Sequence, residues 1–328
     1  MPDRDNPRLR RRRRLEAGEQ PAGREVRRGR RRGQGRVRTP KQELGRRRAD
    51  QFETRLGPLM DHDVVGPWSV DQGVSGLLRT PPLIDAANRI MVYWSPKSAC
   101  TSVYAWFAAM SGFIDEVQAF NSKSPHQHRK QVFNRSPFFQ RGVEMDPADL
   151  RAVKVLREPY GRAVSIYRHA LKTGFADKDL DAFSGGKLTA AGGFSFQQFL
   201  DMLDQLDFGR ANIHYRPQLH VYESIRKPDR IINISNENMF EALNGFAVSC
   251  GLPAVDLAQF DWLHAIEHGR KAKSQPVEGD DIDRRVFDKT AAIGEAPFPS
   301  YQQLLTPTAK DRIRKIYAVD FEAYADSL

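Results

Sequence analysis

The chain has 328 residues, a length that suits one large domain or two small ones and is enough to bury a sizeable core. Its formal net charge is +10, but the first 50 positions hold 19 of the 51 basic residues and only 7 of the 41 acidic ones. The remaining 278 residues carry 32 basic and 34 acidic side chains. The excess positive charge therefore belongs to the N-terminal segment and gives no support for a nucleic-acid-reading domain.

Composition excludes several further classes of protein. No run of 18 apolar residues occurs and the Arg-rich start lacks the apolar stretch of a signal peptide, so we expect no membrane span and a cytoplasmic protein. The two cysteines, Cys100 and Cys250, give no disulfide framework and suit a reducing compartment. Neither they nor the eight histidines have the spacing of a zinc site, so no metal is expected.

Residues 1–55 come first in chain order. Arginine runs at 10–14, 30–32 and 46–48 are separated by few large apolar residues, and such a segment cannot offset its conformational entropy, so it predicts a disordered tail. We favour a solvated arm, which includes the case that translation begins at Met60. The alternative is an electrostatic tether to nucleic acid or to anionic lipid at the inner membrane surface.

Residues 56–88 are rich in Gly, Pro and Asp and are expected to be an irregular lead-in to a domain over residues 89–328. That domain opens with a mostly apolar run at 89–94, which has the length and the β-branched and aromatic residues of a buried strand. A polar loop follows, and then apolar residues recur at helical spacing over 103–110. The predicted order is strand, loop, helix.

The loop over 96–102 has the chemistry of an anion site. Free N–H groups and the helix dipole favour negative charge at the start of the following helix, and Lys97 adds a point charge. The other side chains are small enough for the backbone to close around an oxyanion: Pro96, Ser98, Ala99, Cys100, Thr101 and Ser102. The alternative is an ordinary helix capped by Thr101 or Ser102, with a solvated lysine.

A second strand at 152–156 leads through Arg157 and Pro159 into another helix. Arg157 leaves the tip of that strand, and Ser165 lies two turns up the helix from its start. A guanidinium fork and a hydroxyl suit a phosphate monoester, although Arg-Glu-Pro is also common as an ion pair at a helix start. The two loops together are more specific than either alone.

The order strand, loop, helix occurs a third time, with a strand at 230–234 and a helix at 239–249, and further helices are predicted at 196–206 and 308–324. Repeated alternation of strand and helix predicts a three-layer α/β domain with a parallel sheet. Ligands of such sheets bind beyond the carboxyl ends of the strands, where both loops lie.

Six segments, in order from residue 89 to the C-terminus, resemble the carbohydrate-type (family 2) sulfotransferases. YWSPKSACTSVYAWF is similar to their 5′-phosphosulfate loop, Pro-Lys-x-Ala-Cys-Thr-Ser/Asn. KVLREPYGRAVSIYRH is similar to their 3′-phosphate loop, Arg-Asp/Glu-Pro-x-x-Arg-x-x-Ser-x-Tyr. The likeness continues through FSFQQFL, the segment at 212–218, DRIINISNE and IRKIYAVDFEAYAD.

The resemblance implies a P-loop-like domain, with its central parallel sheet flanked by helices, that uses 3′-phosphoadenosine 5′-phosphosulfate (PAPS) and no metal. Lys97 would contact the phosphosulfate and its bridging oxygen, with Ser98 to Ser102 around the 5′-phosphate, while Arg157 and Ser165 would hold the 3′-phosphate. The acceptor would be a hydroxyl of a saccharide or glycolipid. Lumenal relatives carry a membrane anchor and extra cysteines, and their absence here favours a bacterial-type cytoplasmic enzyme.

An acceptor hydroxyl needs a base, and three histidines are candidates. His126 and His128 lie in the polar stretch between the two loops, where relatives often place a base, and we favour His126 over His128. Each is equally compatible with an exposed loop histidine. His214 is less favoured, because in its His-x-x-Pro-Gln segment it has the alternative role of ordering the cleft.

Two rival functions remain open at this point. A P-loop kinase or NTPase is disfavoured, because the first loop has no glycine and its lysine comes first, unlike a Walker motif. A nucleic-acid-binding protein acting through the basic tail requires that the tail carry the function.

Overall fold

The computed structural model describes residues 81–121, 124–260, 262 and 277–328. The predicted tail, the alternative start at Met60 and most of the predicted lead-in lie outside these residues. The strands are β1 (Leu83–Asp85), β2 (Ile90–Tyr93), β3 (Arg151–Leu156), β4 (Gly193–Phe194), β5 (Arg230–Asn233) and β6 (Phe287–Asp288).

In the described residues, most helices lie in the long segments that connect the strands. The helices are α3 (Cys100–Met110), α4 (Ile114–Asn121), α5 (Pro125–Gln131), α6 (Pro137–Glu144), α7 (Pro159–Thr173), α8 (Asp177–Ser184), α9 (Lys187–Ala190), α10 (Phe196–Asp204), α11 (Met239–Ser249), α13 (Lys289–Ile293), α14 (Tyr301–Leu304), α15 (Pro307–Ile316) and α16 (Ala318–Ala323). Short 3-10 turns connect them: η1 (Phe133–Arg135), η2 (Pro147–Asp149), η3 (Val221–Ser224), η4 (Leu257–Gln259), η5 (Ile282–Arg284) and η6 (Ala325–Ser327).

The main sheet has the order β1-β2-β3-β5, in which β2, β3 and β5 are parallel and β1 is antiparallel to β2. Pairing of Tyr93 with Lys154, and of Leu156 with Asn233, brings the carboxyl ends of the parallel strands to one edge. Right-handed crossovers through helices are the usual way to join parallel strands. The predicted α/β architecture is confirmed, with a mixed rather than purely parallel sheet.

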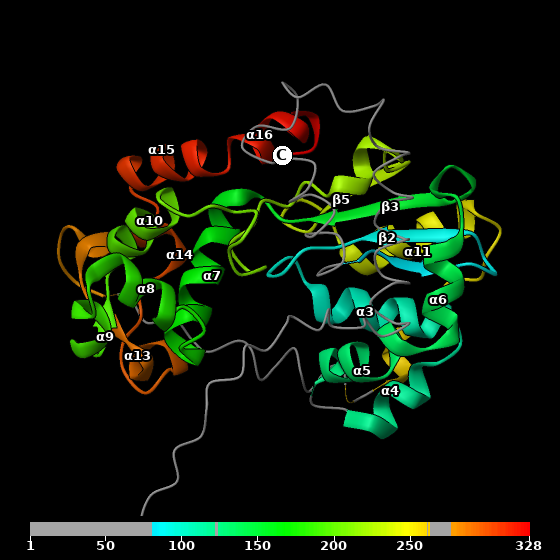
Figure 1. Cartoon of the computed structure of the whole chain (residues 1–328), viewed down its shortest axis with the longest axis horizontal. Coiled ribbons are helices and arrows are strands. Elements are labelled where there is room, and N and C mark those ends of the chain that lie inside the picture. Colours follow the sequence, from blue (N-terminus) through cyan, green and yellow to red (C-terminus); the bar gives the residue numbers. More distant parts are fainter. Residues whose placement is uncertain (1–80, 122–123, 261, 263–276) are drawn as a thin grey trace, which may run out of the picture. The chain divides into compact units, whose positions relative to one another are not determined.

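Alternating side chains of the sheet face two different layers. Ile90 and Val92 pack with α3 and α11 on one face, and Met91 and Tyr93 pack with the end of α6 and with η3 on the other. Figure 1 shows α3 and α11 on the same side of the strands. Burial on both faces explains why the strands read as continuous apolar runs.

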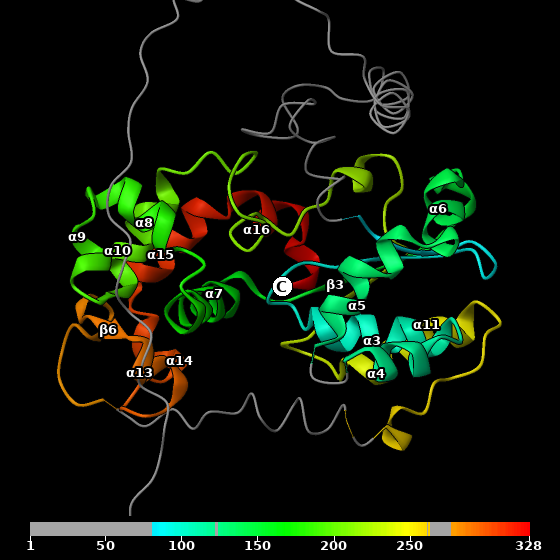
Figure 2. The same ribbon diagram turned by 60° about the horizontal axis from the view of Figure 1, so that its bottom comes forward.

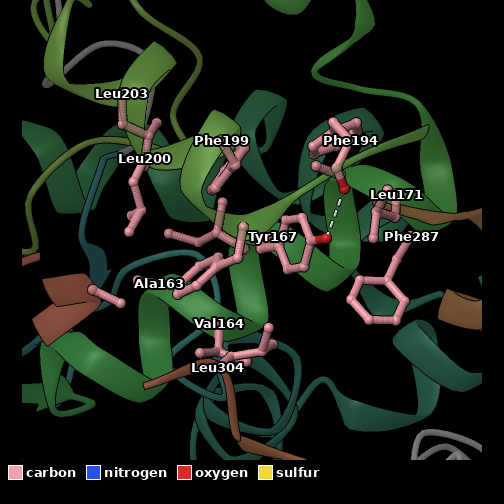
Figure 3. Packing of buried hydrophobic residues seen from close by; sticks show 14 of the residues in the cluster. Ala163, Val164, Tyr167, Leu171, Phe194, Phe199, Leu200, Leu203, Phe287 and Leu304 are labelled. Atoms are coloured by element: carbon pink, nitrogen blue, oxygen red, sulfur yellow. Dashed lines mark hydrogen bonds between the residues drawn. The ribbon is translucent and has the colours of Figure 1, made fainter. Parts of the chain in front are cut away.

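A second core forms around α7. Its buried residues come from α7, α8, α10, α13 and α15, which gather together in Figure 2. Tyr167 lies at its centre, and its hydroxyl donates to the carbonyl of Phe194 at 2.8 Å (Figure 3). Because α7 begins at the tip of β3, this packing fixes the start of α7 relative to the sheet.

The strand β1 lies within the segment that was predicted to be an irregular lead-in. Three residues of the supposed irregular segment form an edge strand, after which the Asp85 carboxylate accepts hydrogen bonds from the backbone N–H groups of Ala87 and Asn88 at 3.0 and 3.1 Å. A three-residue strand between a Pro-Pro pair and an Asx turn gives too short a pattern to detect.

The predicted helix over 308–324 is divided into α15 and α16. Tyr317 interrupts it, with its ring fully buried against Phe208. The break lets Asp320 turn inward, where it contacts the segment described below. Within the described ranges, no helix combines the length and the apolar character that crossing a membrane requires.

Candidate active site

The two predicted loops lie beside each other at the carboxyl edge of the sheet. The first follows β2 and the second follows β3, and these strands are hydrogen-bonded neighbours. The edge is where ligands of open α/β sheets bind. The fold therefore brings the two loops together even though their chain positions are about sixty residues apart.

The backbone of the first loop is curled tightly. Lys97 and Ala99 have φ angles of 70° and 55°, in the left-handed region that side-chain-bearing residues rarely occupy. Left-handed residues alternate with others in backbone nests, whose N–H groups converge on an anion. Each such residue costs on the order of 1 kcal/mol, and positions held this way cluster at binding sites.

Helix α3 begins at Cys100, directly after this curl. Its N-cap residue is Ala99, which makes no side-chain capping bond, so the predicted alternative with Thr101 or Ser102 as the cap is wrong. The first turn of a helix leaves backbone N–H groups without helical acceptors, and here no side chain of its N-cap satisfies them. The start of α3 is therefore suited to an anionic group.

Gln218 connects the two loops through its side chain. Its Oε1 accepts hydrogen bonds from the Ser98 hydroxyl at 2.6 Å and from the Arg157 backbone N–H at 3.0 Å, and lies 3.2 Å from the Ser95 hydroxyl. Its Nε2 donates to the Arg157 carbonyl at 2.7 Å. One buried amide thus sets the spacing between the lysine loop and the arginine loop.

Arg162, in the first turns of α7, adds a second connection. Its Nε donates to the Pro96 carbonyl at 3.1 Å, and its Nη2 donates to the carbonyls of Arg216 and His214 at 2.6 and 3.3 Å. The side chain is almost fully buried. The guanidinium therefore holds the lysine loop against the segment that carries Gln218.

Buried charges support Gln218 from behind. Asp320 accepts from the backbone N–H groups of Gln218 and Leu219 at 2.6 and 3.1 Å. Lys154 donates to the Gln218 carbonyl and forms a salt bridge with Glu223 at 2.7 Å, with both side chains buried. Removal of one partner of a buried pair is strongly destabilising, so these contacts constrain the segment.

The second loop starts α7 with a capped turn. Glu158 accepts from the backbone N–H groups of Tyr160 and Gly161, and the Tyr301 hydroxyl donates to the same carboxylate. Burial lowers the pKa of Arg157, while the adjacent Glu158 carboxylate partly opposes this shift. The half-buried Arg157 guanidinium is thus a candidate partner for an anionic group. Ser165 is half-buried on α7, two turns from its start.

The predicted loop residues divide into two groups. Ser98 and Thr101 turn their hydroxyls toward protein partners, namely Gln218 and His126, so these hydroxyls build the loop. Lys97, Ala99, Cys100 and Ser102 are half-buried, so they retain some exposure at the loop surface.

His126 and His128 point in different directions from α5. His126 contacts the first turn of α3: its Nε2 lies 2.8 Å from the Thr101 hydroxyl and 3.3 Å from the Cys100 sulfur. His128 is buried among aromatic rings and lies 2.8 Å from the Tyr104 hydroxyl. Burial lowers the pKa of His128. Of these two, His126 is the histidine in contact with the residues that follow the lysine loop.

The sequence prediction did not include Gln218, Arg162 or Asp320 among the site residues. Gln218 ends the segment at 212–218 that was noted only as part of the resemblance. For Asp320, a polar residue within the apolar pattern of the C-terminal helix, that pattern is the signal that could have identified it.

The fold defines a class of protein: an α/β protein with two polar loops side by side at the carboxyl edge of its sheet. No group of three or more potential metal-ligating side chains is assembled within the described ranges. The sulfotransferase family model matches residues 83–243, which include both loops and the Gln218 segment. These residues form a sulfotransferase family domain, which supports sulfuryl transfer as the reaction. No curated protein and no solved structure matches the chain.

Proposed function

We propose that the protein transfers the sulfuryl group of PAPS to a hydroxyl of a saccharide or glycolipid. The observation that carries the proposal is the contact of one Gln218 oxygen with both Ser98 and Arg157, because it sets the two loops at a fixed separation. A nucleotide with anionic groups at both its 5′ and 3′ positions is a ligand that would use both loops.

The residues have separate roles in this proposal. Lys97 and the N–H groups at the start of α3 bind the 5′-phosphosulfate, while Arg157 and Ser165 bind the 3′-phosphate. Sulfuryl transfer, like phosphoryl transfer, needs an in-line nucleophile and stabilisation of the charge that develops on the leaving oxygen. Lys97 supplies that stabilisation, which is typically the largest single contribution.

The acceptor hydroxyl also loses a proton to a base, which is worth about 10²–10⁴ in rate. His126 is the base that the sequence favours, and His128 is the weaker candidate because its ring is enclosed in the core. His126 is tested against His214 below.

The 3′-phosphate loop makes a specific prediction. Substitution Arg157→Lys keeps the charge but removes the bidentate fork, and Ser165→Ala removes one hydroxyl. We expect the preference for PAPS over adenosine 5′-phosphosulfate, which lacks the 3′-phosphate, to fall by about 10-fold to 100-fold in Arg157→Lys, as expected for the loss of about 1.4–3 kcal/mol. Isothermal titration of both nucleotides measures it.

Lys172→Met, in the exposed last turn of α7, is the matched control and should leave the preference unchanged. If Arg157→Lys binds both nucleotides with the wild-type preference, the assigned 3′-phosphate site is wrong.

The rival functions are separated by two measurements. A kinase or NTPase predicts that ATP with Mg²⁺ raises the melting temperature, whereas the proposal predicts that PAPS does so.

A nucleic-acid-binding function predicts that deletion of residues 1–50 abolishes activity. We propose a cytoplasmic enzyme and expect the deleted protein to retain turnover within about twofold, as measured by transfer of labelled sulfate. Loss of membrane association on deletion would support a tether at the inner membrane surface.

A further inference from the structure

The hydrogen bonds of His214 determine which ring nitrogen carries the proton. One atom of Asn212, assigned as Oδ1, lies 3.1 Å from the His214 backbone N–H and 2.8 Å from His214 Nδ1. Because a backbone N–H only donates, that atom must be the amide oxygen. Since the oxygen only accepts, Nδ1 carries a proton and donates it. In the neutral ring, Nε2 therefore has the lone pair.

The ring is also held in place by its neighbours. Phe175 and His169 pack against it, with ring centroids at 4.7 and 5.2 Å, and they pack against each other at 5.3 Å. His169 lies on α7 and Phe175 comes two residues after its end, and the start of α7 lies at the second loop. A histidine that is held on one side by an amide oxygen and packed against two other rings is pre-organised for a defined direction of proton transfer.

The backbone contacts place His214 next to the lysine loop. The Arg162 guanidinium donates to the His214 carbonyl at 3.3 Å and to the Pro96 carbonyl at 3.1 Å. Pro96 directly precedes Lys97. His214 is thus anchored to the same guanidinium as the residue before the catalytic lysine of the proposed function.

Burial, together with nearby cationic groups, keeps the His214 ring neutral. Burial lowers the pKa of His214 to about 3, with contributions from the neighbouring cationic groups on α7, α5 and the first loop: His169, Lys97, Lys130 and Arg162. No carboxylate is among these neighbours. The ring is therefore neutral in the free protein throughout the physiological range, so it can accept a proton.

Binding of a polyanionic donor beside Lys97 opposes the effect of these cations. An added negative charge favours the protonated imidazole, so it raises the pKa of His214 toward values at which a base is efficient. The sulfuryl donor would thus also raise the basicity of His214 through its own negative charge. The other two histidines differ, since His126 Nε2 already lies against Thr101 and His128 is enclosed in the core.

We propose that His214, oriented by Asn212, is the base that takes the proton of the acceptor hydroxyl, an inference that rests on the proposed function. The acceptor oxygen forms a bond to sulfur as its proton passes to Nε2. The bond between sulfur and the bridging oxygen breaks, and its electron pair leaves with adenosine 3′,5′-bisphosphate beside Lys97. The imidazolium then releases its proton to solvent.

The first test compares matched histidine variants. Transfer of labelled sulfate from PAPS to a panel of polysaccharides and glycolipids is measured for His214→Gln and His126→Gln, with affinity for adenosine 3′,5′-bisphosphate measured by titration calorimetry. We expect His214→Gln to lose at least 100-fold in turnover and less than fivefold in nucleotide affinity. His214→Asn is the second variant if His214→Gln does not fold.

Retained turnover in the His214 variants, or a 100-fold loss in His126→Gln alone, overturns the inference and leaves the proposed function intact. Failure of the wild-type protein to bind adenosine 3′,5′-bisphosphate overturns both.

The second test reads the protonation of the ring itself. Proton NMR of the His214 Cε1–H is followed between pH 3 and 8, with and without adenosine 3′,5′-bisphosphate. We expect a midpoint at low pH in the free protein and an upward shift by more than one pH unit with the nucleotide bound. Asn212→Asp keeps the acceptor and adds a negative charge, so it should raise the midpoint again. A midpoint that does not respond to the nucleotide contradicts the proposed coupling.

Discussion

Replacing Lys97 with methionine is expected to lower the turnover of sulfate transfer by about 10²–10³ while the protein stays folded, because loss of one pre-organised charge-stabilising donor has an effect of this size. Methionine keeps most of the apolar stem, and the left-handed backbone at this position is no more costly for methionine than for lysine. The measurement is label transfer from PAPS, with nucleotide affinity determined in parallel.

Affinity for adenosine 3′,5′-bisphosphate should fall much less than turnover, because this product lacks the transferring group and retains the 3′-phosphate contacts. Lys310→Met, which removes an exposed lysine of α15, serves as the control. Turnover within threefold of wild type in Lys97→Met would show that the charge at this loop takes no part in the transfer.

Substitution of Gln218 by leucine is expected to reduce both stability and donor binding. It leaves the Ser98 hydroxyl and the N–H and carbonyl of Arg157 without their buried partner, and each unsatisfied group costs about 1–3 kcal/mol. With these three groups affected, we expect a loss of at least about 3 kcal/mol in the free energy of unfolding by urea. Nucleotide affinity should fall in the remaining folded protein, because the two loops lose their fixed separation.

Gln218→Glu separates the role of the Gln218 side chain as hydrogen-bond acceptor from its role as donor. The carboxylate keeps an acceptor for Ser98 and for the Arg157 N–H but loses the donor to the Arg157 carbonyl, so its loss of stability should differ from that of Gln218→Leu. Gln302→Leu, at an exposed position of α14, is the matched control. Unchanged stability and unchanged nucleotide affinity in Gln218→Leu would mean that the bridge has no role in setting the loops.

The sheet and its two loops were predictable because their signals are local. An apolar run followed by a loop and a helical pattern needs only neighbouring residues, and the boundaries of α11 agreed with the predicted 239–249. The predicted strand at 230–234 likewise agreed with β5 to within one residue. The positions of both polar loops follow from such local patterns together with the rule that parallel strands share their carboxyl edge.

The bridge through Gln218 was not predictable in this way. Its bonds reach 120 positions back to Ser98 and 61 positions back to Arg157, and no periodicity carries information over such separations. The same limit applies to Asp320, which contacts the Gln218 backbone 102 positions away. These contacts exist only once the sheet has brought its strand ends together.

The histidines show a further limit, which concerns direction. His126 and His128 are two positions apart on a helix, so they point to different sides, but the sequence does not say which side faces the lysine loop. The structure orients His126 toward Thr101 and His128 toward Tyr104. The tautomer of His214 likewise depends on an Asn212 contact that the sequence alone did not disclose.

The central claim is that one nucleotide spans two loops set side by side by Gln218. A crystal structure of the protein with adenosine 3′,5′-bisphosphate measures this most directly. We expect the 5′-phosphate at the start of α3 beside Lys97 and the 3′-phosphate within hydrogen-bonding distance of Arg157 and Ser165. A nucleotide bound away from this edge of the sheet, or one that contacts a single loop only, would contradict the account.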